Sequence, residues 1–381
     1  MLNKLKKLDW GILIILVFLM VISTVVIHSA TANFPKYAGS DVKQLIFYGM
    51  GFFIAIAATL FDYRIVLKSW HVLYGIGVSM LILVYFFGAV INGARGWFKL
   101  GTMSFQPAEI VKIVLIIGIA YIMGRRQGER LTFMKDLLPI AAFSFLPFLL
   151  VMIQPDLGNA IIYLVIVLGM LWIGNVKYTH VIAGLAVVVA GLVLFVSLFN
   201  TFNQEIFDYL DDRDMGHWHK RINTFINPET ATANDKHQSE NAQIAIGSGG
   251  LSGDGYLQGD MKNGGFVPYP YSDSIFVVIG EEFGFQGSAI LLLLYFLLIY
   301  RMIIIAFKCY DLRASFIVIG IVSMYVFQVF QNIGMMIGIM PITGITLPFV
   351  SYGGTSLLLN MLSIGLVFSI KAHQEKYELA D

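Results

Sequence analysis

The most constraining feature of this 381-residue sequence is a run of 57 residues, 314–370, without a single Asp, Glu, Lys or Arg. A helix crosses the hydrocarbon core of a membrane in about 20 residues, so the run is too long for one crossing. Pro341, Pro348, Gly353 and Gly354 lie near its middle, and such residues interrupt helices. The run therefore predicts two membrane-spanning helices joined by an irregular segment.

Eight further apolar runs precede it, each with little or no charge and close to the length of one crossing: residues 10–35, 44–61, 69–94, 107–124, 137–155, 157–176, 178–204 and 283–307. The chain is 57% hydrophobic and 13% charged, whereas soluble domains have about 25% charged residues. This composition excludes a soluble, fibrous or disordered protein. We expect an all-α, polytopic membrane protein with ten transmembrane helices, forming a single domain over residues 1–381.

Lysines and arginines near the ends of the spans predict the orientation. With the amino terminus inside, the inner segments hold fifteen of them and the short outer segments hold only Lys36, Lys43, Arg95 and Lys99. Both termini are therefore expected in the cytoplasm. The net charge of +1 gives no indication of a nucleic-acid partner.

The only large hydrophilic segment is the outer loop between the seventh and eighth spans, residues 205–272. It carries ten carboxylates against five Lys or Arg. Loops of this length are usually functional or disordered. Aromatic residues such as Trp218, Tyr256 and Tyr271 favour a packed structure for this one.

Ionisable side chains within spans mark functional sites by default. Glu109 and Lys112 are three residues apart in the fourth span, so they share a helix face and can neutralise each other. A purely structural ion pair is about as probable as a functional one. Asp156 lies at the end of the fifth span, and Glu281 and Glu282 lie beside the eighth.

Asp273 is the most informative of the acids. It precedes the apolar residues 275–279, so we expect it where the outer loop enters the membrane. A carboxylate there is partly desolvated, which raises its proton affinity and suits a general base acting near neutral pH. An N-cap of the eighth span is an equally natural role, and the two roles are compatible.

Cations and an aromatic residue are expected on the same outer face: Arg95, Trp97, Lys99, Lys220 and Arg221. They suit a substrate with a phosphate on a lipid and a neutral polar headgroup. A solvated rim beside lipid headgroups is the alternative. The glycine-rich residues 247–253 lack the spacing of nucleotide-binding loops, so no nucleotide is expected.

Residues 332–356 closely resemble the signature of the SEDS (shape, elongation, division and sporulation) proteins, with Ser-Tyr-Gly-Gly at 351–354 in place. Further segments agree, namely residues 93–99, 106–112, 154–158, 245–250, 272–276 and 280–284. The resemblance extends from the third span to the tenth. Within this family, the compact termini favour RodA over FtsW or SpoVE.

The resemblance implies a peptidoglycan glycosyltransferase of the bacterial cell membrane that polymerises lipid II during cell elongation, with an extracytoplasmic active site. It also implies that the protein works with a class B penicillin-binding protein, as transpeptidase, and with other proteins of the elongation complex. Asp273 would match the family's essential aspartate and Trp97 an important tryptophan. Glu109 and Lys112 would match a polar pair in a central cavity.

Four further residues belong to matching motifs and are expected to bind substrate or support the site: Asp156, Ser351, Gly353 and Gly354. The sequence departs from the family pattern at Ser272 and Ser274, where Thr and Phe often flank the aspartate. This difference concerns the geometry of the loop and leaves the carboxylate in place.

The hypothesis is an inverting transfer in which Asp273 takes the proton from the attacking sugar hydroxyl. The departing diphosphate needs cations, supplied by Lys99, Lys112, Lys220 and Arg221 or by a divalent metal. The main alternative is a transporter of lipid or solute, such as a lipid II flippase, because broken helices and intramembrane acids also occur there. A structural scaffold for other wall enzymes is a third possibility.

Overall fold

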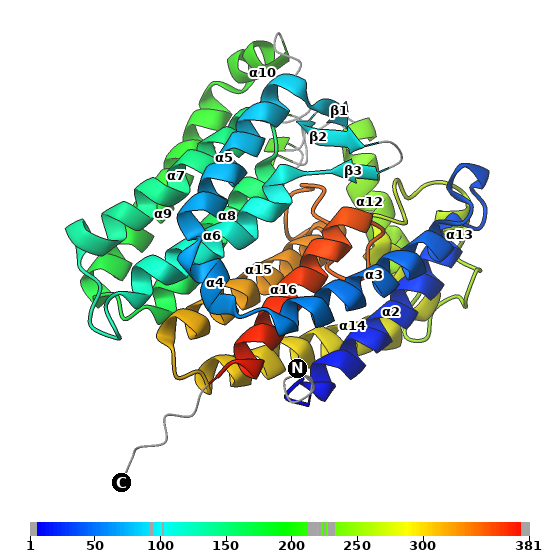
Figure 1. Cartoon of the computed structure of the whole chain (residues 1–381). Helices are drawn as coiled ribbons and strands as arrows, with labels where there is room; N and C mark the ends of the chain where they lie inside the picture. Colours follow the sequence, from blue (N-terminus) through cyan, green and yellow to red (C-terminus); the bar gives the residue numbers. More distant parts are fainter. Residues whose placement is uncertain are drawn as a thin grey trace.

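The chain forms a bundle of long helices in a computed structural model, which describes residues 6–91, 94–100, 103–211, 216, 219, 222–223, 226–227 and 233–374. The first described transmembrane helix begins, and the last one ends, at the same end of the bundle (Figure 1). We name this the terminal end. The opposite end, which carries three short strands, we name the loop end.

Ten described helices are long and apolar. Nine apolar helical segments of the described chain are long enough to cross a membrane, when α3 is counted together with η1 and α7 together with η2, and α8 is a shorter apolar helix of 17 residues. They are α2 (Trp10–Thr31), α3 (Ser40–Leu60), α5 (Trp70–Phe87), α6 (Pro107–Gly124), α7 (Leu138–Ile153), α8 (Leu157–Ile173), α9 (Tyr178–Thr201), α14 (Ile275–Phe307), α15 (Leu312–Met336) and α16 (Gly354–Ala372). Short helices lie between them, namely η1 (Pro35–Tyr37), α4 (Tyr63–Lys68) and η2 (Phe133–Leu137). The expected all-α membrane fold is confirmed.

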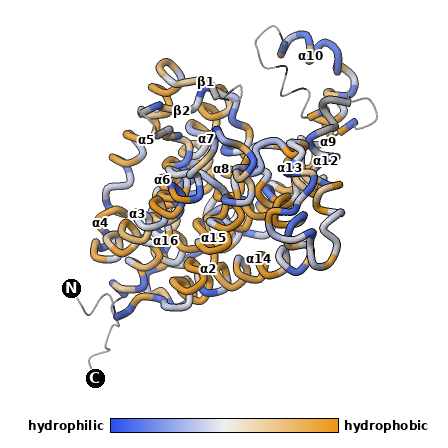
Figure 2. Tube along the Cα trace, turned by 90° about the vertical axis from the view of Figure 1, so that its right-hand side faces the viewer, coloured by the Kyte–Doolittle hydropathy of each residue, from blue (hydrophilic) through white to orange (hydrophobic). Residues whose placement is uncertain are grey.

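The helices differ in how deeply they lie within the bundle. In α6, 83% of the apolar span is buried, whereas none of the span in α9 is. Hydrophobic residues run along the helices, and hydrophilic ones gather in segments such as α10 (Asn203–Asp211) and α13 (Asp260–Asn263) (Figure 2). Lipid tails are as apolar as these exposed side chains, so the outer helix faces need no protein cover.

A small antiparallel sheet follows α5 and was not predicted from the sequence. The expected span over residues 69–94 is shorter, because α5 ends at Phe87. The strands pair in the order β1 (Ala89–Ile91), β2 (Ala94–Leu100) and β3 (Met103–Phe105). Arg95, Trp97 and Lys99 occupy every second position of β2, and successive positions of a strand point to opposite faces.

The loop over residues 205–272 contains α10, α12 (Ala233–Ser248) and α13. It packs against a break in α14 at Gly284, where φ is 60° and ψ is −156°. Such a conformation is essentially restricted to glycine. Four backbone hydrogen bonds of 2.9 to 3.1 Å cross this break, joining Asp254 to Glu281, Gly255 to Glu282, Phe285 to Gly250 and Gln286 to Leu251.

The charge-free run is interrupted as expected. α15 ends at Met336, α16 begins at Gly354, and residues 337–353 between them form no helix. We name residues 337–353 the connector. Several of its apolar side chains are buried in the bundle, including Leu347 and Val350. Backbone at this depth is tolerated only where the protein satisfies its polar groups.

An ion cluster ties three helices together at the terminal end. Asp9, which is 3% exposed, accepts hydrogen bonds from the guanidinium of Arg301 at 2.7 Å and from Lys371 Nζ at 2.8 Å. It also caps α2 through the backbone N–H of Ile12 at 3.2 Å. Burial raises the pKa of the Asp9 carboxyl, but the bonds from Lys371 and Arg301 hold that pKa below its ordinary value.

We predict that the Asp9 cluster contributes to the unfolding free energy at neutral pH and that this contribution is lost at acidic pH. Because the folded pKa of Asp9 is depressed, its contribution is complete above the ordinary pKa of about 4 and is lost as the pH falls through the folded pKa. Asp9→Asn should lower the unfolding free energy by about 2 kcal/mol at neutral pH. The thermal midpoint of the variant in detergent, scanned from pH 7 to pH 3, should fall less steeply than that of the unchanged protein. Glu129→Gln, an exposed carboxylate at the same end, is the control. Equal acid sensitivity of Asp9→Asn and the unchanged protein would contradict the prediction.

Candidate active site

Asp273 lies at the loop end, on the turn that leads into α14, and is partly exposed. This is where the sequence placed it. The side chain of Asn332, in α15, donates hydrogen bonds to the carbonyls of Asp273 at 2.8 Å and of Ile345 at 2.7 Å. One buried amide therefore fixes the aspartate's backbone to the connector.

Two further hydrogen bonds join the residues before Asp273 to the connector. Ser351 Oγ donates to the carbonyl of Ser272 at 2.6 Å and accepts from the backbone N–H of Leu347 at 2.8 Å. The backbone N–H of Tyr352 donates to the carbonyl of Tyr271 at 2.9 Å. Ser351 is thus a supporting residue, because its hydroxyl is engaged with backbone on both sides.

Gly344 of the connector faces the carboxylate itself. A Cβ atom built on this residue would lie 3.8 Å from Asp273 Oδ2, and φ of Gly344 is +74°. Left-handed backbone favours glycine because it has no Cβ. The carboxylate therefore lies beside backbone that carries no side chain.

Buried polar oxygens gather on the segments that hold Asp273. Ser274 Oγ, Gln331 Oε1 and Asn332 Oδ1 have no hydrogen-bond partner within the described part of the chain. Buried polar atoms are nearly always paired. These three exceptions lie on the segments that position the aspartate.

A second polar cluster lies at the loop end of α6 and α8. Lys112 Nζ is 2.8 Å from Glu109 Oε2, and the two side chains are 2% and 13% exposed. The shared helix face predicted from their spacing is confirmed. Nearby, Asp156 caps α8 and accepts hydrogen bonds from Asn159 and, at 2.6 Å, from Gln106 Nε2.

The connector lies between the two clusters. A Cβ atom on Gly158, in the first turn of α8, would lie 2.9 Å from Ile345 Cγ1 and 3.3 Å from the carbonyl of Thr343. These residues flank Gly344, which faces Asp273. The Asp156 cap and Asp273 are therefore neighbours across a few residues of connector.

The sheet covers this region with the predicted residues of β2. Trp97 is half-buried, whereas Arg95 and Lys99 are exposed. A Cβ atom on Gly96 would lie 3.6 Å from Gln106 Nε2, which places β2 beside the Asp156 cluster. The hydroxyl of Thr355 in α16 donates to the carbonyl of Ser104 in β3 at 3.0 Å.

Glycines 353 and 354 close the connector. Gly353 is the N-cap position of α16. A Cβ atom on Gly354 would lie 2.3 Å from the ring of Phe47, so Gly354 contributes to the close approach of α3 and α16. A role of either glycine in binding substrate stays a prediction. Lys220 and Arg221 lie outside the described residues, so their place beside Asp273 stays a prediction.

The structure adds residues that sequence reasoning missed. Asn332, Gln106 and Lys262 each hold an acid or its backbone. Asn332 opens the matching motif, directly after Gln331 in a largely apolar helix, and these amides were the available signal. Lys262 gave none, because its partner is 20 residues away in the chain.

Lys262 and Glu282 form a buried ion pair that holds the loop over residues 205–272 on the bundle. Their side chains are 1% and 0% exposed, and Lys262 Nζ and Ser29 Oγ both donate to the Glu282 carboxylate. The neighbouring Glu281 accepts from the backbone N–H groups of Met261 and Lys262. The two glutamates beside the eighth span are thus anchors for α13.

Taken together, the fold and the site define a polytopic membrane protein with a carboxylate poised at one end of its bundle. The family model FTSW_RODA_SPOVE, described as Cell cycle protein, matches residues 4–376. The chain belongs to this family of SEDS proteins, and the resemblance seen in the sequence is confirmed.

Two curated relatives match over nearly their whole length. Stage V sporulation protein E of Bacillus subtilis (strain 168) is 32% identical over 382 residues, which cover 98% of this chain and 99% of the relative. Peptidoglycan glycosyltransferase MrdB of Escherichia coli (strain K12) is 33% identical over 369 residues, which cover 97% and 94%. Because these identities differ by one percentage point, they do not separate the subgroups, and the RodA-like assignment stays a prediction.

Solved structures share the fold. A chain described under "Structural coordination of polymerization and crosslinking by a peptidoglycan synthase complex" aligns with a TM-score of 0.80 and 27% identity. The Thermus thermophilus rod shape determining protein RodA aligns with a TM-score of 0.70 and 27% identity. Each alignment covers 97% of this chain and 98% of the other.

We predict that Asn332→Ala slows catalysis more than its effect on folding explains. The substitution leaves the carbonyls of Asp273 and Ile345 without their shared donor, and a displacement of about 1 Å at a reacting group costs roughly 100-fold in rate. Gln44→Ala is the matched control, because this buried amide bonds to the carbonyl of Ser351 at 3.3 Å and does not bond to Asp273. Polymer formation should be compared at equal folded fraction. Similar rates for the two variants would contradict the prediction.

We also predict that replacing Lys262 alone lowers the unfolding free energy more than replacing both Lys262 and Glu282. Lys262→Met leaves a buried carboxylate uncompensated, which should cost about 3–5 kcal/mol of unfolding free energy. Lys262→Met combined with Glu282→Gln should recover most of the loss. Thermal midpoints in detergent measure both variants. A double variant no more stable than the single one would show that the pair does not anchor α13 electrostatically.

Proposed function

We propose that the protein is a peptidoglycan glycosyltransferase that polymerises lipid II during cell elongation, with Asp273 as the general base. The activity is supported by family membership and by the names of its relatives, which include Peptidoglycan glycosyltransferase MrdB. The structural observation that supports this site is the position of Asp273 at the loop end. Asn332 donates to its backbone carbonyl, and Gly344 of the connector lies beside its carboxylate.

In the proposed step, Asp273 takes the proton from the 4-hydroxyl of the acceptor N-acetylglucosamine. The freed oxygen attacks the anomeric carbon of the donor, and the bond from that carbon to the lipid diphosphate breaks. Attack from the face opposite the leaving group inverts an α-linkage to β. The diphosphate is already a good leaving group, so no partner general acid is required.

The departing diphosphate carries negative charge that cations must stabilise. Lys112, paired with Glu109, and Lys99 on the exposed face of β2 are the described candidates, and Lys220 and Arg221 are further ones. Among the described residues, no group of three or more His, Cys, Asp or Glu could hold a metal ion. We propose a divalent cation as the alternative source of positive charge for the diphosphate, and no step is assigned to it.

The proposed orientation places both termini in the cytoplasm and Asp273 outside. Basic residues such as Arg64, Arg125, Arg301 and Lys371 all lie on segments at the terminal end of the bundle. Cytoplasmic segments of membrane proteins carry an excess of Lys and Arg. This orientation brings Asp273 to the surface on which peptidoglycan is assembled.

The proposed partner is a class B penicillin-binding protein acting as transpeptidase, together with other proteins of the elongation complex. One structural relative was solved in work on polymerization and crosslinking by a peptidoglycan synthase complex. A membrane transporter is less favoured than an enzyme, because the relatives' names describe glycosyltransferases. A scaffold role without activity is disfavoured for the same reason.

We predict that Asp273→Asn abolishes polymerisation while leaving the fold intact. Removing a general base costs about 10²–10⁴-fold in rate, and asparagine keeps the size of the side chain. The assay is polymer formation from lipid II by purified protein in detergent, where transport between compartments is impossible. Asp260→Asn, an exposed carboxylate of α13, should keep full activity. Polymerisation by Asp273→Asn at the unchanged rate would refute the assignment, and no polymer from the unchanged protein would favour a transporter or scaffold.

A further inference from the structure

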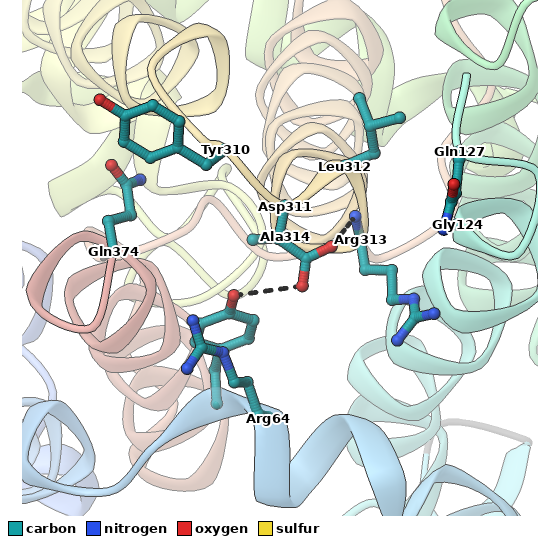
Figure 3. A pocket seen from close by; sticks show the side chains of 10 residues that line it. Arg64, Gly124, Gln127, Tyr310, Asp311, Leu312, Arg313, Ala314 and Gln374 are labelled. Atoms are coloured by element: carbon teal, nitrogen blue, oxygen red, sulfur yellow. Dashed lines mark hydrogen bonds between the residues drawn. The ribbon is translucent and has the colours of Figure 1, made fainter. Parts of the chain in front are cut away.

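A polar pocket of about 520 Å³ lies at the terminal end of the bundle, opposite Asp273. It is lined by the start of α4, the end of α6, the start of α15 and Gln374, two residues after α16. Arg64 and Arg313 project from different helices on either side of Asp311 (Figure 3). Gln127 and Gln374 contribute amide groups to the lining.

Arg313 is held in place by packing. A Cβ atom on Gly124 would lie 2.1 Å from Arg313 Cγ, so the arginine stem lies directly on the glycine backbone. Its guanidinium is 5.5 Å from the ring centre of Tyr121, and the guanidinium of Arg125 is 4.9 Å from the same ring. Two cations thus share one aromatic ring.

Neither cation has a carboxylate at ion-pair distance within the described part of the chain. Other arginines at this end do have such a partner: Arg126 pairs with Asp136 at 2.9 Å and Arg301 with Asp9 at 2.7 Å. Like charges that converge without a counter-charge repel each other. A bound anion would therefore relieve the repulsion between Arg125 and Arg313.

The described carboxylates near the pocket are engaged with other groups and form no ion pair with Arg125 or Arg313. Asp311 caps α15 through the backbone N–H of Arg313 at 2.9 Å and accepts from the hydroxyl of Tyr63 at 3.3 Å. Asp62 caps α4 and lies 3.9 Å from Arg64. Among the described residues that line the pocket, the guanidinium groups of Arg64 and Arg313 stand against the single carboxylate of Asp311, and Arg125 lies next to the pocket.

We infer that this pocket binds the phosphate headgroup of an anionic phospholipid. Basic pockets between helices at the membrane surface recognise such headgroups. Apolar side chains that could contact the acyl chains are exposed beside it, with Phe61 67% and Ile65 62% exposed. Amides of Gln127 and Gln374 can bond to headgroup hydroxyls. The site is independent of the proposed glycosyl transfer and of the orientation in the membrane.

The test is native mass spectrometry of the purified full chain, released from detergent with equal amounts of phosphatidylglycerol and phosphatidylethanolamine. The unchanged protein should retain phosphatidylglycerol preferentially. Arg125→Gln combined with Arg313→Gln should lower this preference by roughly fivefold per arginine. Arg313→Lys, which keeps the charge, should lower it less than Arg313→Gln. Arg130→Gln, an exposed arginine of the α6–η2 loop, should leave it unchanged, because Arg130 does not line the pocket and is not one of the two arginines on the ring of Tyr121.

Each result decides the matter. An unchanged preference in the double glutamine variant, or an equal loss in Arg130→Gln, would overturn the inference. Displacement of phosphatidylglycerol by millimolar inorganic phosphate would reassign the pocket to free phosphate. If the double variant does not fold, the two single glutamine variants give the same comparison. Polymer formation can be measured on the same samples, so failure here is distinguishable from failure of the proposed enzyme activity.

Discussion

Satisfying the backbone of the connector is the constraint on which the site depends. Residues 345–351 of the connector have no helix and are mostly buried in an apolar bundle, where an unpaired peptide group costs several kcal/mol. Asn332 donates to the carbonyls of Ile345 and Asp273, and Ser351 Oγ accepts from the backbone N–H of Leu347 and donates to the carbonyl of Ser272. Some of the bonds that satisfy the connector therefore also position the turn that bears Asp273.

Much of the fold could be predicted because hydrophobic length is a strong signal. The ten apolar helices and the break within residues 314–370 follow from charge-free runs and from Pro341 and Pro348. The predicted end of the third span was wrong. The residues after Phe87 are as apolar as those of the helix, but they pair as strands. Pairing across a hairpin depends on the partner strand, which a run of apolar residues does not reveal.

The charged residues of the site could be predicted from the sequence, whereas the residues that position them were harder to predict. Asp273, Glu109 and Lys112 stand out as charges among apolar residues, and the structure places them at the same end of the bundle. Lys262 could not be matched to Glu282 from the sequence, because the contact depends on how the loop folds back on α14. The position of Trp97 likewise depends on how β2 pairs with its neighbouring strands, which the sequence alone does not give.

The hydrogen bonds across the break at Gly284 have a mechanical consequence. Four backbone hydrogen bonds join residues 250–255 to the two halves of α14, so lifting the loop would leave peptide groups unpaired on both partners at once. The loop and the first half of α14, which begins two residues after Asp273, are therefore expected to move as one body. A partner protein that pulled on the loop would transmit the force directly to the aspartate.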